Sequence, residues 1–341
     1  MRRNIMIMRG ILLGLLLALA ACGKPELYTQ ESFVFGTRVE VSVYGVPESK
    51  ARQATAHVLG IFDQMHHNLH AWEPGPLSTL NGTFSRSPQR GPVSPEISAI
   101  IQDATRYSEQ SNGLFNPAIG NLIRLWGFQS DRFQARLPDP QAIAALVSAN
   151  PQMRDIVIDG KQAYSTNPAV RLDLGGYAKG YALDVAAAYL RSQGIRNALI
   201  NIGGNIMALG QHGERPWKVG IQNPRKPGPI ATLDLRDGEA IGTSGDYQRF
   251  FELNGKRYCH IIDPRSGWPV QGVEAVTVLI SPGRHAGTLS DVASKPLFIA
   301  GPAGWRYAAE QMGVSAAMLI DGGGMVHLTP TMQKRLNFDT H

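Results

Sequence analysis

The sequence LDLGGYAKGYALD at residues 172–184 is the most informative part of this chain. It has the pattern of an apolar strand that passes through Gly175 and Gly176 into the start of a helix. Glycine lets a phosphate approach the backbone, and the N–H groups and dipole of a first helical turn favour negative charge. The stretch lacks the Lys-Ser/Thr ending of a P-loop and the spacing of GxGxxG. It therefore indicates a nucleotide site of another design, with a tight packing turn as the alternative.

Around this junction the hydrophobic patterns of strands and helices mix without a regular βαβ order. Residues 31–44 alternate and turn at Gly36, which predicts a pair of strands. Asp159-Gly160 and Asn254-Gly255 are two-residue hairpin turns between apolar runs. Apolar spacing or capping residues predict helices at about 48–68, 95–113, 139–150, 177–192, 289–300 and 305–312, and further strands at 273–280 and 316–320. We predict an α+β fold of mixed or antiparallel sheets with packed helices, rather than a doubly wound sheet.

The N-terminus has the pattern of a signal peptide. Three arginines within the first nine residues precede an apolar run at 11–19, and this run is too short to span a membrane. The residues Leu19-Ala20-Ala21-Cys22 resemble the lipobox of bacterial lipoproteins, in which the cysteine becomes the acylated first residue of the mature protein. An ordinary secretory signal with a chance cysteine is the alternative.

These observations predict three segments: a lipoprotein signal peptide at 1–21, a tether at 22–30 and one large domain at 31–341. Acylation of Cys22 predicts a protein that is anchored in the lipid bilayer, at the periplasmic face of the cell membrane. The sequence does not distinguish the inner membrane from the outer one.

The composition is that of a globular protein without a nucleic-acid partner. Hydrophobic residues make up 43% of the chain, which is enough for a large core. The predicted signal peptide holds three of the 33 Lys and Arg and none of the 27 Asp and Glu, so the mature protein is close to neutral. Nucleic-acid binding needs a clustered basic stripe, and this sequence has none.

Two further groups of residues resemble reactive sites but are interpreted otherwise. His66, His67 and His70 lie at the end of a predicted helix, with no carboxylate or cysteine to complete a metal site. Cys259 precedes His260 on a predicted strand, where neighbouring side chains point to opposite faces. Acylation of Cys22 leaves Cys259 no disulfide partner, so it is either a buried small residue or a reactive thiol. We expect burial, because its neighbours have the pattern of a strand.

Two polar loops follow apolar strands later in the chain. The first is GTSGDY at 242–247 and the second is HIIDPRSGWP at 260–269. Such loops often carry function, although Asx or ST turns would also explain them. His260 is the candidate general base because imidazole titrates near neutral pH, and Asp246 and Asp263 are its competitors. The alternative for His260 is a structural role at the end of a strand.

Eight motifs in order resemble those of the FAD:protein FMN transferases, over about residues 32–301. They are FGTRVEV, WEPGPLSTLN, SNGLFNPAIGNLIRLWGF, LDLGGYAKGYALD, NIGGN, TSGDY, HIIDPRSGWP and SDVASKPLFIAG. The resemblance implies an α+β fold and an enzyme that splits FAD at its pyrophosphate. FMN passes to a Ser or Thr hydroxyl of an exported redox protein, and AMP leaves. Such a transfer requires positioning and neutralisation of the phosphate charge.

The resemblance also implies a Mg²⁺ site. In the family the metal is held by a backbone carbonyl, here that of Ala178, by a carboxylate, here Asp291, and by a residue four positions later that is usually Thr. That position is Lys295, whose ammonium has three donors and no acceptor. We hypothesise that Lys295 lies beside Asp291 and acts on the phosphates as a point charge, which weakens or removes the dependence on Mg²⁺. The alternative is that Lys295 points to solvent.

The flavin-contacting positions that the resemblance implies depart from the family in several places. Phe35 replaces Met, Trp72 replaces Tyr, and Asn116 replaces Asp. The aromatic rings can still lie against the isoalloxazine, and Asn116 can still hydrogen-bond to the flavin or ribose. The implied FAD-contacting residues are Phe35, Trp72, Leu114, Phe115, Asn116, Gly175, Tyr181 and Ile262.

Two other functions fit the same motifs. An FAD pyrophosphatase would share the site and pass FMN to water. A lipoprotein that carries FAD would bind the cofactor without cleaving it. An assay with FAD and an exported acceptor protein separates the three functions.

Overall fold

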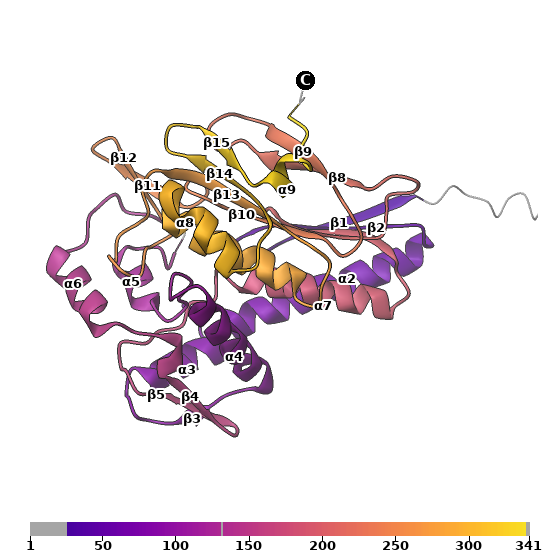
Figure 1. Ribbon diagram of the computed structural model, residues 1–341. Helices are drawn as coiled ribbons and strands as arrows, with labels where there is room; N and C mark the ends of the chain where they lie inside the picture. The colour runs from indigo at the N-terminus through magenta and orange to yellow at the C-terminus, as the bar shows by residue number, and fades with distance from the viewer. Residues whose placement is uncertain (1–25, 131, 339–341) are drawn as a thin grey trace, which may run out of the picture.

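An eight-stranded sheet forms the centre of the computed structural model, which describes residues 26–130 and 132–338 (Figure 1). The predicted signal peptide and Cys22 lie outside the described residues. Every neighbouring pair in the sheet is antiparallel, which confirms the predicted fold class. In spatial order the strands are β1 (Leu27–Val34), β2 (Thr37–Tyr44), β6 (Asn197–Ile202), β7 (Asn205–Leu209), β10 (Ala240–Gly245), β13 (Val273–Ile280), β14 (Ala316–Asp321) and β15 (Val326–Leu328).

The sheet begins earlier in the chain than the sequence predicted. Residues 27–30, predicted to belong to the tether, form the first half of β1 and pair with the end of β2. Thr29 Oγ1 lies 2.8 Å from Ser42 Oγ across this pair. The turn between the strands holds Phe35 at φ 56° and Gly36 at φ 68°, as a two-residue hairpin of type I′ requires. The folded domain therefore includes part of the predicted tether.

Three helices cover one face of the sheet (Figure 1). They are α2 (Glu48–Leu69), α7 (Ala178–Ser192) and α8 (Ala286–Gln311), and they share the main hydrophobic core with the strands. The α7 and α8 backbones touch at Gly180, where a Cβ would lie 2.6 Å from Asp291 Cβ and 2.8 Å from Thr288 Cα. This contact brings the start of α7 against the first turns of α8.

A hairpin and a short helix cover the opposite face of the sheet. The hairpin consists of β8 (Trp217–Gln222) and β9 (Pro229–Leu235), and the helix is α9 (Pro330–Gln333). Because both faces are covered, all eight residues of β13, with the sequence VEAVTVLI, are buried. Its alternate side chains join the core on either face.

The remaining elements lie at the left and lower side of Figure 1. They are α3 (Pro76–Phe84), β3 (Gly91–Pro92), α4 (Pro95–Gln110), α5 (Gly120–Leu125), α6 (Pro140–Ala149), the 3-10 turn η1 (Met153–Asp155), β4 (Ile156–Asp159), β5 (Gln162–Ser165), β11 (Phe250–Leu253) and β12 (Lys256–Cys259). An aromatic cluster around Trp126 joins α5 and α6 to the β11–β12 hairpin. In it, Trp126 stacks on Tyr258 with ring centroids 5.8 Å apart.

Most of the predicted elements are present. α2, α4, α6 and α7 lie within a few residues of their predicted bounds, and the second hairpin turns at Asn254-Gly255 as predicted. The first hairpin turns one residue later than predicted, because Asp159 still pairs with Gln162 and the loop residues are 160 and 161. The two helices predicted at 289–300 and 305–312 form α8, which is interrupted at Gly301 with φ 65°. α3 and α5 were not predicted, because such short elements show no clear helical period. No helix among the described residues is long and apolar enough to cross a membrane.

Candidate active site

The glycine-rich junction lies at the start of α7, as the sequence predicted. The Asp173 carboxylate accepts a hydrogen bond from the Gly175 N–H at 2.8 Å and another from Trp72 Nε1 at 2.9 Å. Asp173 therefore fixes the glycine loop and the indole relative to each other. The helix begins at Ala178, two positions after the second glycine. The Ala178 N–H donates to the Leu174 carbonyl at 2.8 Å, and the positive end of the helix dipole lies at this junction.

A buried carboxylate on α8 lies against this junction. Asp291 is fully buried, and its Oδ2 accepts from the Gly180 N–H of α7 at 3.0 Å. Lys295, one turn further along α8, forms an ion pair with Asp291 Oδ1, and its Nζ also donates to the Asp291 carbonyl at 2.6 Å. Lys179 Nζ lies 4.0 Å from the same Oδ1. We call Lys179, Lys295 and Asp291 the lysine cluster; its two ammonium groups share one carboxylate.

Burial and charge act in opposite directions within the lysine cluster. Burial would raise the pKa of Asp291, but Lys179, Lys295 and the Gly180 N–H hold that pKa well below its ordinary value. Burial lowers the pKa of Lys295 to about 8, although Asp291 opposes the shift. At pH 7 Asp291 is therefore an anion and Lys295 is mostly an ammonium ion. The cluster carries a net positive charge.

The aliphatic part of Lys295 lies between the glycine loop and the core. A Cβ on Gly176 would lie 3.2 Å from Lys295 Cε and 3.7 Å from Phe115 Cε2. Only 18% of the Lys295 side chain is exposed. The predicted contact with Asp291 is thus present, and the alternative in which Lys295 points to solvent is wrong.

Strand β10, which carries the GTSGDY motif, packs directly against α8 beside the lysine cluster. A Cβ on Gly242 would lie 2.6 Å from the Ser290 carbonyl carbon, so a larger residue would separate the strand from the helix. The hydroxyls of Ser244 and Ser294 are hydrogen-bonded at 2.7 Å. The motif therefore positions the turn of α8 that carries Lys295.

Asp246, one of the predicted competitors for the general base, is held in an ion-pair network. Arg225 donates to both of its carboxylate oxygens at 2.7 Å, and Arg257 lies 3.5 Å away. Arg225 also forms an ion pair with Glu274 at 3.1 Å. Because both oxygens of Asp246 are bound to arginine, the structure gives this residue a role in holding the Arg225 loop against the sheet.

His260 occupies a partly buried position near the two lysines. Its Nδ1 lies 3.2 Å from the Arg249 carbonyl oxygen. Burial, together with the positive charges of Arg249, Lys179 and Lys295, lowers the pKa of His260 to about 3. The imidazole is neutral at pH 7 and is a weaker base than free imidazole. The sequence argument from an ordinary imidazole pKa therefore does not hold in this environment.

The neighbours of His260 have structural roles. Cys259 is buried as predicted, and burial raises the pKa of its thiol to about 12, so it stays protonated. The Asp263 carboxylate accepts from the Arg265 N–H at 2.9 Å and forms an ion pair with the Arg265 guanidinium. This is the Asx turn that the sequence left open for the loop.

Comparison with known proteins agrees with this geometry. A model of the ApbE family matches residues 35–319. The chain belongs to the ApbE family. An FAD:protein FMN transferase of Rhodobacter capsulatus is 43% identical over 304 residues, 89% of this chain, which spans 57% of that relative's length. One of Klebsiella pneumoniae is 32% identical over 296 residues, which cover 84% of this chain and 83% of that protein. The crystal structure of the Thermotoga maritima ApbE protein has a TM-score of 0.81 at 27% identity, covering 93% and 100% of the two chains.

Several of the flavin positions implied by the ApbE motifs meet at the lysine cluster. Trp72 and Gly175 are joined through Asp173, and the Phe115 ring lies beside Gly176 together with the side chain of Lys295. Leu114 packs against the main core directly before Phe115. Of the two aromatic residues here, Trp72 is partly exposed and Phe115 is buried.

Other implied flavin positions lie in different surroundings. The Asn116 amide donates to the Pro151 carbonyl at 2.8 Å and accepts from the Ala118 N–H at 3.0 Å. Tyr181 lines a cavity of 190 Å³ between α7 and α2, and Ile262 is buried in the Trp126 cluster. The Phe35 ring lies 5.7 Å from that of His66. The contact of these residues with FAD stays a prediction.

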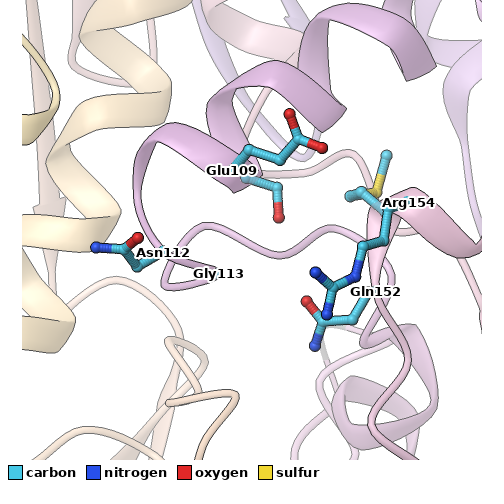
Figure 2. A pocket seen from close by; sticks show the side chains of 7 residues that line it. Glu109, Asn112, Gly113, Gln152 and Arg154 are labelled. Carbon is cyan, nitrogen blue, oxygen red and sulfur yellow. The ribbon is translucent and has the colours of Figure 1, made fainter.

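A larger cavity, of 510 Å³, opens between the end of α4 and η1. Figure 2 shows Asn112 and Gln152 on opposite sides of this opening. None of the predicted site residues lines it, although Gly113 at its edge directly precedes Leu114. Its lining residues are Ser108, Glu109, Asn112, Gly113, Gln152, Met153 and Arg154.

Two residues of the site had no role in the sequence analysis. Lys179 could have been recognised, because a cation in the first turn of a helix opposes the helix dipole and needs a reason. Asp184 of α7 accepts from the N–H groups of Gly287 and Thr288 at 2.8 Å and from the Thr288 hydroxyl at 2.6 Å. Since α8 has no side-chain cap of its own, Asp184 caps the helix that carries Asp291.

The residues of this site do not fit the Mg²⁺ ion that the ApbE motifs imply. Asp291 is already bound to Lys295 and to the Gly180 N–H. Lys295 occupies the third ligand position, and an ammonium has no lone pair to coordinate a metal. Within residues 26–130 and 132–338, no three His, Cys, Asp or Glu side chains lie together as a metal site. Mg²⁺ requires a nearly octahedral set of oxygens, which the lysine cluster does not offer.

Proposed function

We propose that the protein is an FAD:protein FMN transferase. The oxygen of an acceptor Ser or Thr hydroxyl forms a bond to the FMN phosphorus, and the P–O bond to the AMP half of FAD breaks. AMP leaves with the electron pair of that bond, and the hydroxyl proton passes to AMP or to solvent. The products are AMP and an exported redox protein that carries FMN in phosphoester linkage.

The observation that carries this proposal is the net positive charge beside a glycine-rich helix start. Two ammonium groups share the Asp291 carboxylate, and Gly175 and Gly176 precede the first N–H groups of α7. A pyrophosphate fits such a site, since its cleavage requires fixed positive charge and donors at the phosphates. The two curated ApbE relatives that bear the transferase name align with most of this chain, which supports the same reaction.

The remaining residues of the site bind and orient the flavin half in this proposal. Trp72 is partly exposed and held by Asp173, so its indole offers an aromatic face to an isoalloxazine ring, while Phe115 is buried beside the glycine loop and supports it. We assign no general base, because His260 is a weak one and the carboxylates of Asp246 and Asp263 are bound to arginine. Phosphoryl transfer depends mostly on positioning and charge, so the reaction does not demand a strong base.

The proposal is tested by incubating the full-length protein, in detergent, with FAD and an exported redox domain that carries an acceptor Ser or Thr. We expect a fluorescent acceptor band after denaturing electrophoresis, with one AMP released for each FMN attached to the acceptor. Free FMN and AMP without a labelled acceptor would identify an FAD pyrophosphatase instead, and intact bound FAD would identify a carrier. An acceptor with Ala at the attachment position is the control.

We also propose that the mature protein is anchored by lipid on Cys22 at the periplasmic face of the cell membrane. The signal peptide pattern and the lipobox support this, and the anchor would hold the domain near membrane-bound acceptors. Cys22→Ser should move the protein out of the membrane fraction, whereas Cys259→Ser should leave it there. If processed Cys22→Ser protein stayed in the membrane fraction at the wild-type level, the anchor would be excluded.

A further inference from the structure

We propose that the lysine cluster is a built-in cation that replaces a divalent metal, so that this site binds the FAD pyrophosphate without Mg²⁺. The inference rests on the proposed function, because that function supplies FAD as the ligand. Its basis is the disagreement between the metal that the ApbE motifs imply and the side chains that occupy the site.

The Lys295 ammonium has a donor left for a ligand. Of its three N–H groups, one binds the Asp291 carboxylate and one the Asp291 carbonyl. No other acceptor for Lys295 is found among residues 26–130 and 132–338. The carboxylate and the carbonyl hold the head group in place, so its third donor is fixed before a ligand arrives. Such fixed charge interacts with a phosphate without first having to be ordered.

Lys179 adds a second ammonium group near the same carboxylate oxygen of Asp291. Its Nζ lies 4.0 Å from the carboxylate and donates to the Gly175 carbonyl at 3.2 Å, which places it at the glycine loop. Lys295 Cε lies beside Gly176 of the same loop. A phosphate that approached the backbone of this loop would therefore meet both ammonium groups.

A divalent cation is unfavourable at the same position. To reach Asp291 it would have to displace Lys295, which is held in a largely buried position by that carboxylate. The displaced ammonium would lose its counter-ion, and breaking a buried ion pair on one side is strongly destabilising. The metal would also stand close to two positive charges, which repel it.

The first experiment measures FAD binding to the full-length protein, in detergent, by flavin fluorescence in EDTA and in Mg²⁺. The wild-type dissociation constant should be the same in both, within about twofold. Lys295→Thr should weaken FAD binding in EDTA by about tenfold or more, as expected for the loss of a hydrogen bond to a charged group. Mg²⁺ should restore FAD binding by this variant. Lys218→Thr, the same substitution at an exposed position of β8, is the matched control and should bind like the wild type.

Lys179→Gln serves as a second variant. It keeps the buried pair of Lys295 and Asp291, so it tests the cluster without disturbing the interior of α8. We expect weaker FAD binding in EDTA and no recovery in Mg²⁺. The inference is wrong if EDTA weakens wild-type binding tenfold and Mg²⁺ restores it. It is also wrong if Lys295→Thr binds FAD like the wild type in EDTA while its thermal melt shows that the variant is folded.

Inorganic pyrophosphate separates this inference from the proposed function. It should compete with FAD in EDTA for the wild type and fail to compete for Lys295→Thr. That result would support the built-in cation even if no FMN reached an acceptor, in which case only the transferase proposal would fail. Pyrophosphate that competes equally with both proteins would overturn the inference, whatever the transfer assay shows.

Discussion

One partly buried imidazole, that of His260, contributes to the pH dependence of this protein's stability. The pKa of His260 falls from its ordinary 6.5 to about 3, first because of burial and then because of Arg249. Between these values the unfolded chain binds a proton that the folded chain does not. The free energy of unfolding therefore rises with pH through this window and gains nothing more from His260 above pH 6.5.

His260→Gln should remove this contribution while keeping a polar side chain next to the Arg249 carbonyl. The slope of unfolding free energy against pH between pH 4 and pH 6 should fall by up to about 1.4 kcal/mol per pH unit, the value for one proton. Urea unfolding at several pH values measures it. Above pH 7.5 the slopes of the two proteins should agree, and an unchanged slope below pH 6 would contradict the buried neutral imidazole.

The residues of the site differ in how far the sequence could predict their contacts. Lys295 and Asp291 are four positions apart on one helix, and such pairs are neighbours whatever the rest of the fold does. The approach of Lys179 to Asp291 depends on how α7 crosses α8, which no local pattern contains. Asn116 was carried over from the family, but its amide is bound to the backbone of Pro151, which is distant in sequence, and of Ala118.

The crossing of α7 and α8 is the arrangement of elements on which the site depends. Gly180→Ala would place a methyl group 2.6 Å from Asp291 Cβ and 2.8 Å from Thr288 Cα, and neither atom can move away easily. We expect a loss of about 1–3 kcal/mol in stability by overpacking, with weaker FAD binding because the helices separate. Chemical denaturation and FAD fluorescence measure the two effects.

Gly60→Ala is the matched control for this prediction. Gly60 lies at an exposed position within α2, and a Cβ there would meet nothing within 4 Å. Alanine in a helix is more stable than glycine by about 0.5–1 kcal/mol, so this variant should gain stability. If Gly180→Ala were as stable as Gly60→Ala, the close contact of the helices would not exist in solution.

At the level of elements, prediction succeeded where a pattern is long or a turn is specific. The helical spacing of α2 and the Asn254-Gly255 turn are both local signals. The N-terminal half of β1 was assigned to the tether, because its four residues show no clear alternation by themselves and only pairing with β2 makes them a strand. Short elements such as α5 owe their form to the packing of Trp126 and its neighbours, which is not visible in sequence.

The layered arrangement of the whole molecule was predicted only in outline. The apolar run of β13 indicates burial on both faces, but it does not say what covers each face. The α7 and α8 helices cover one face, and the β8–β9 hairpin covers the other. The C-terminal segment completes the second layer, because Thr232 and Asn337 exchange two backbone hydrogen bonds of 2.8 Å.

An ion pair joins this C-terminal segment to the loop before β10. Arg335 donates to the two carboxylate oxygens of Glu239 at 2.8 and 2.7 Å, and Glu239 is buried. Burial would raise the pKa of Glu239, but Arg335 and the Arg236 N–H outweigh it and hold the pKa below its ordinary value of 4.5. The stabilisation is therefore complete above pH 4.5 and is lost as the pH falls through the lowered value.

Arg335→Met should leave the Glu239 carboxylate buried without its partner and cost about 3 kcal/mol at pH 7. Lys334→Met, at the exposed neighbouring position, should change stability by less than about 0.5 kcal/mol. Urea unfolding at pH 7 and at pH 4 measures both variants, and the deficit of Arg335→Met should shrink at the lower pH as Glu239 takes up a proton. Equal stability of the two variants at pH 7 would show that the ion pair does not hold the C-terminal segment on the sheet.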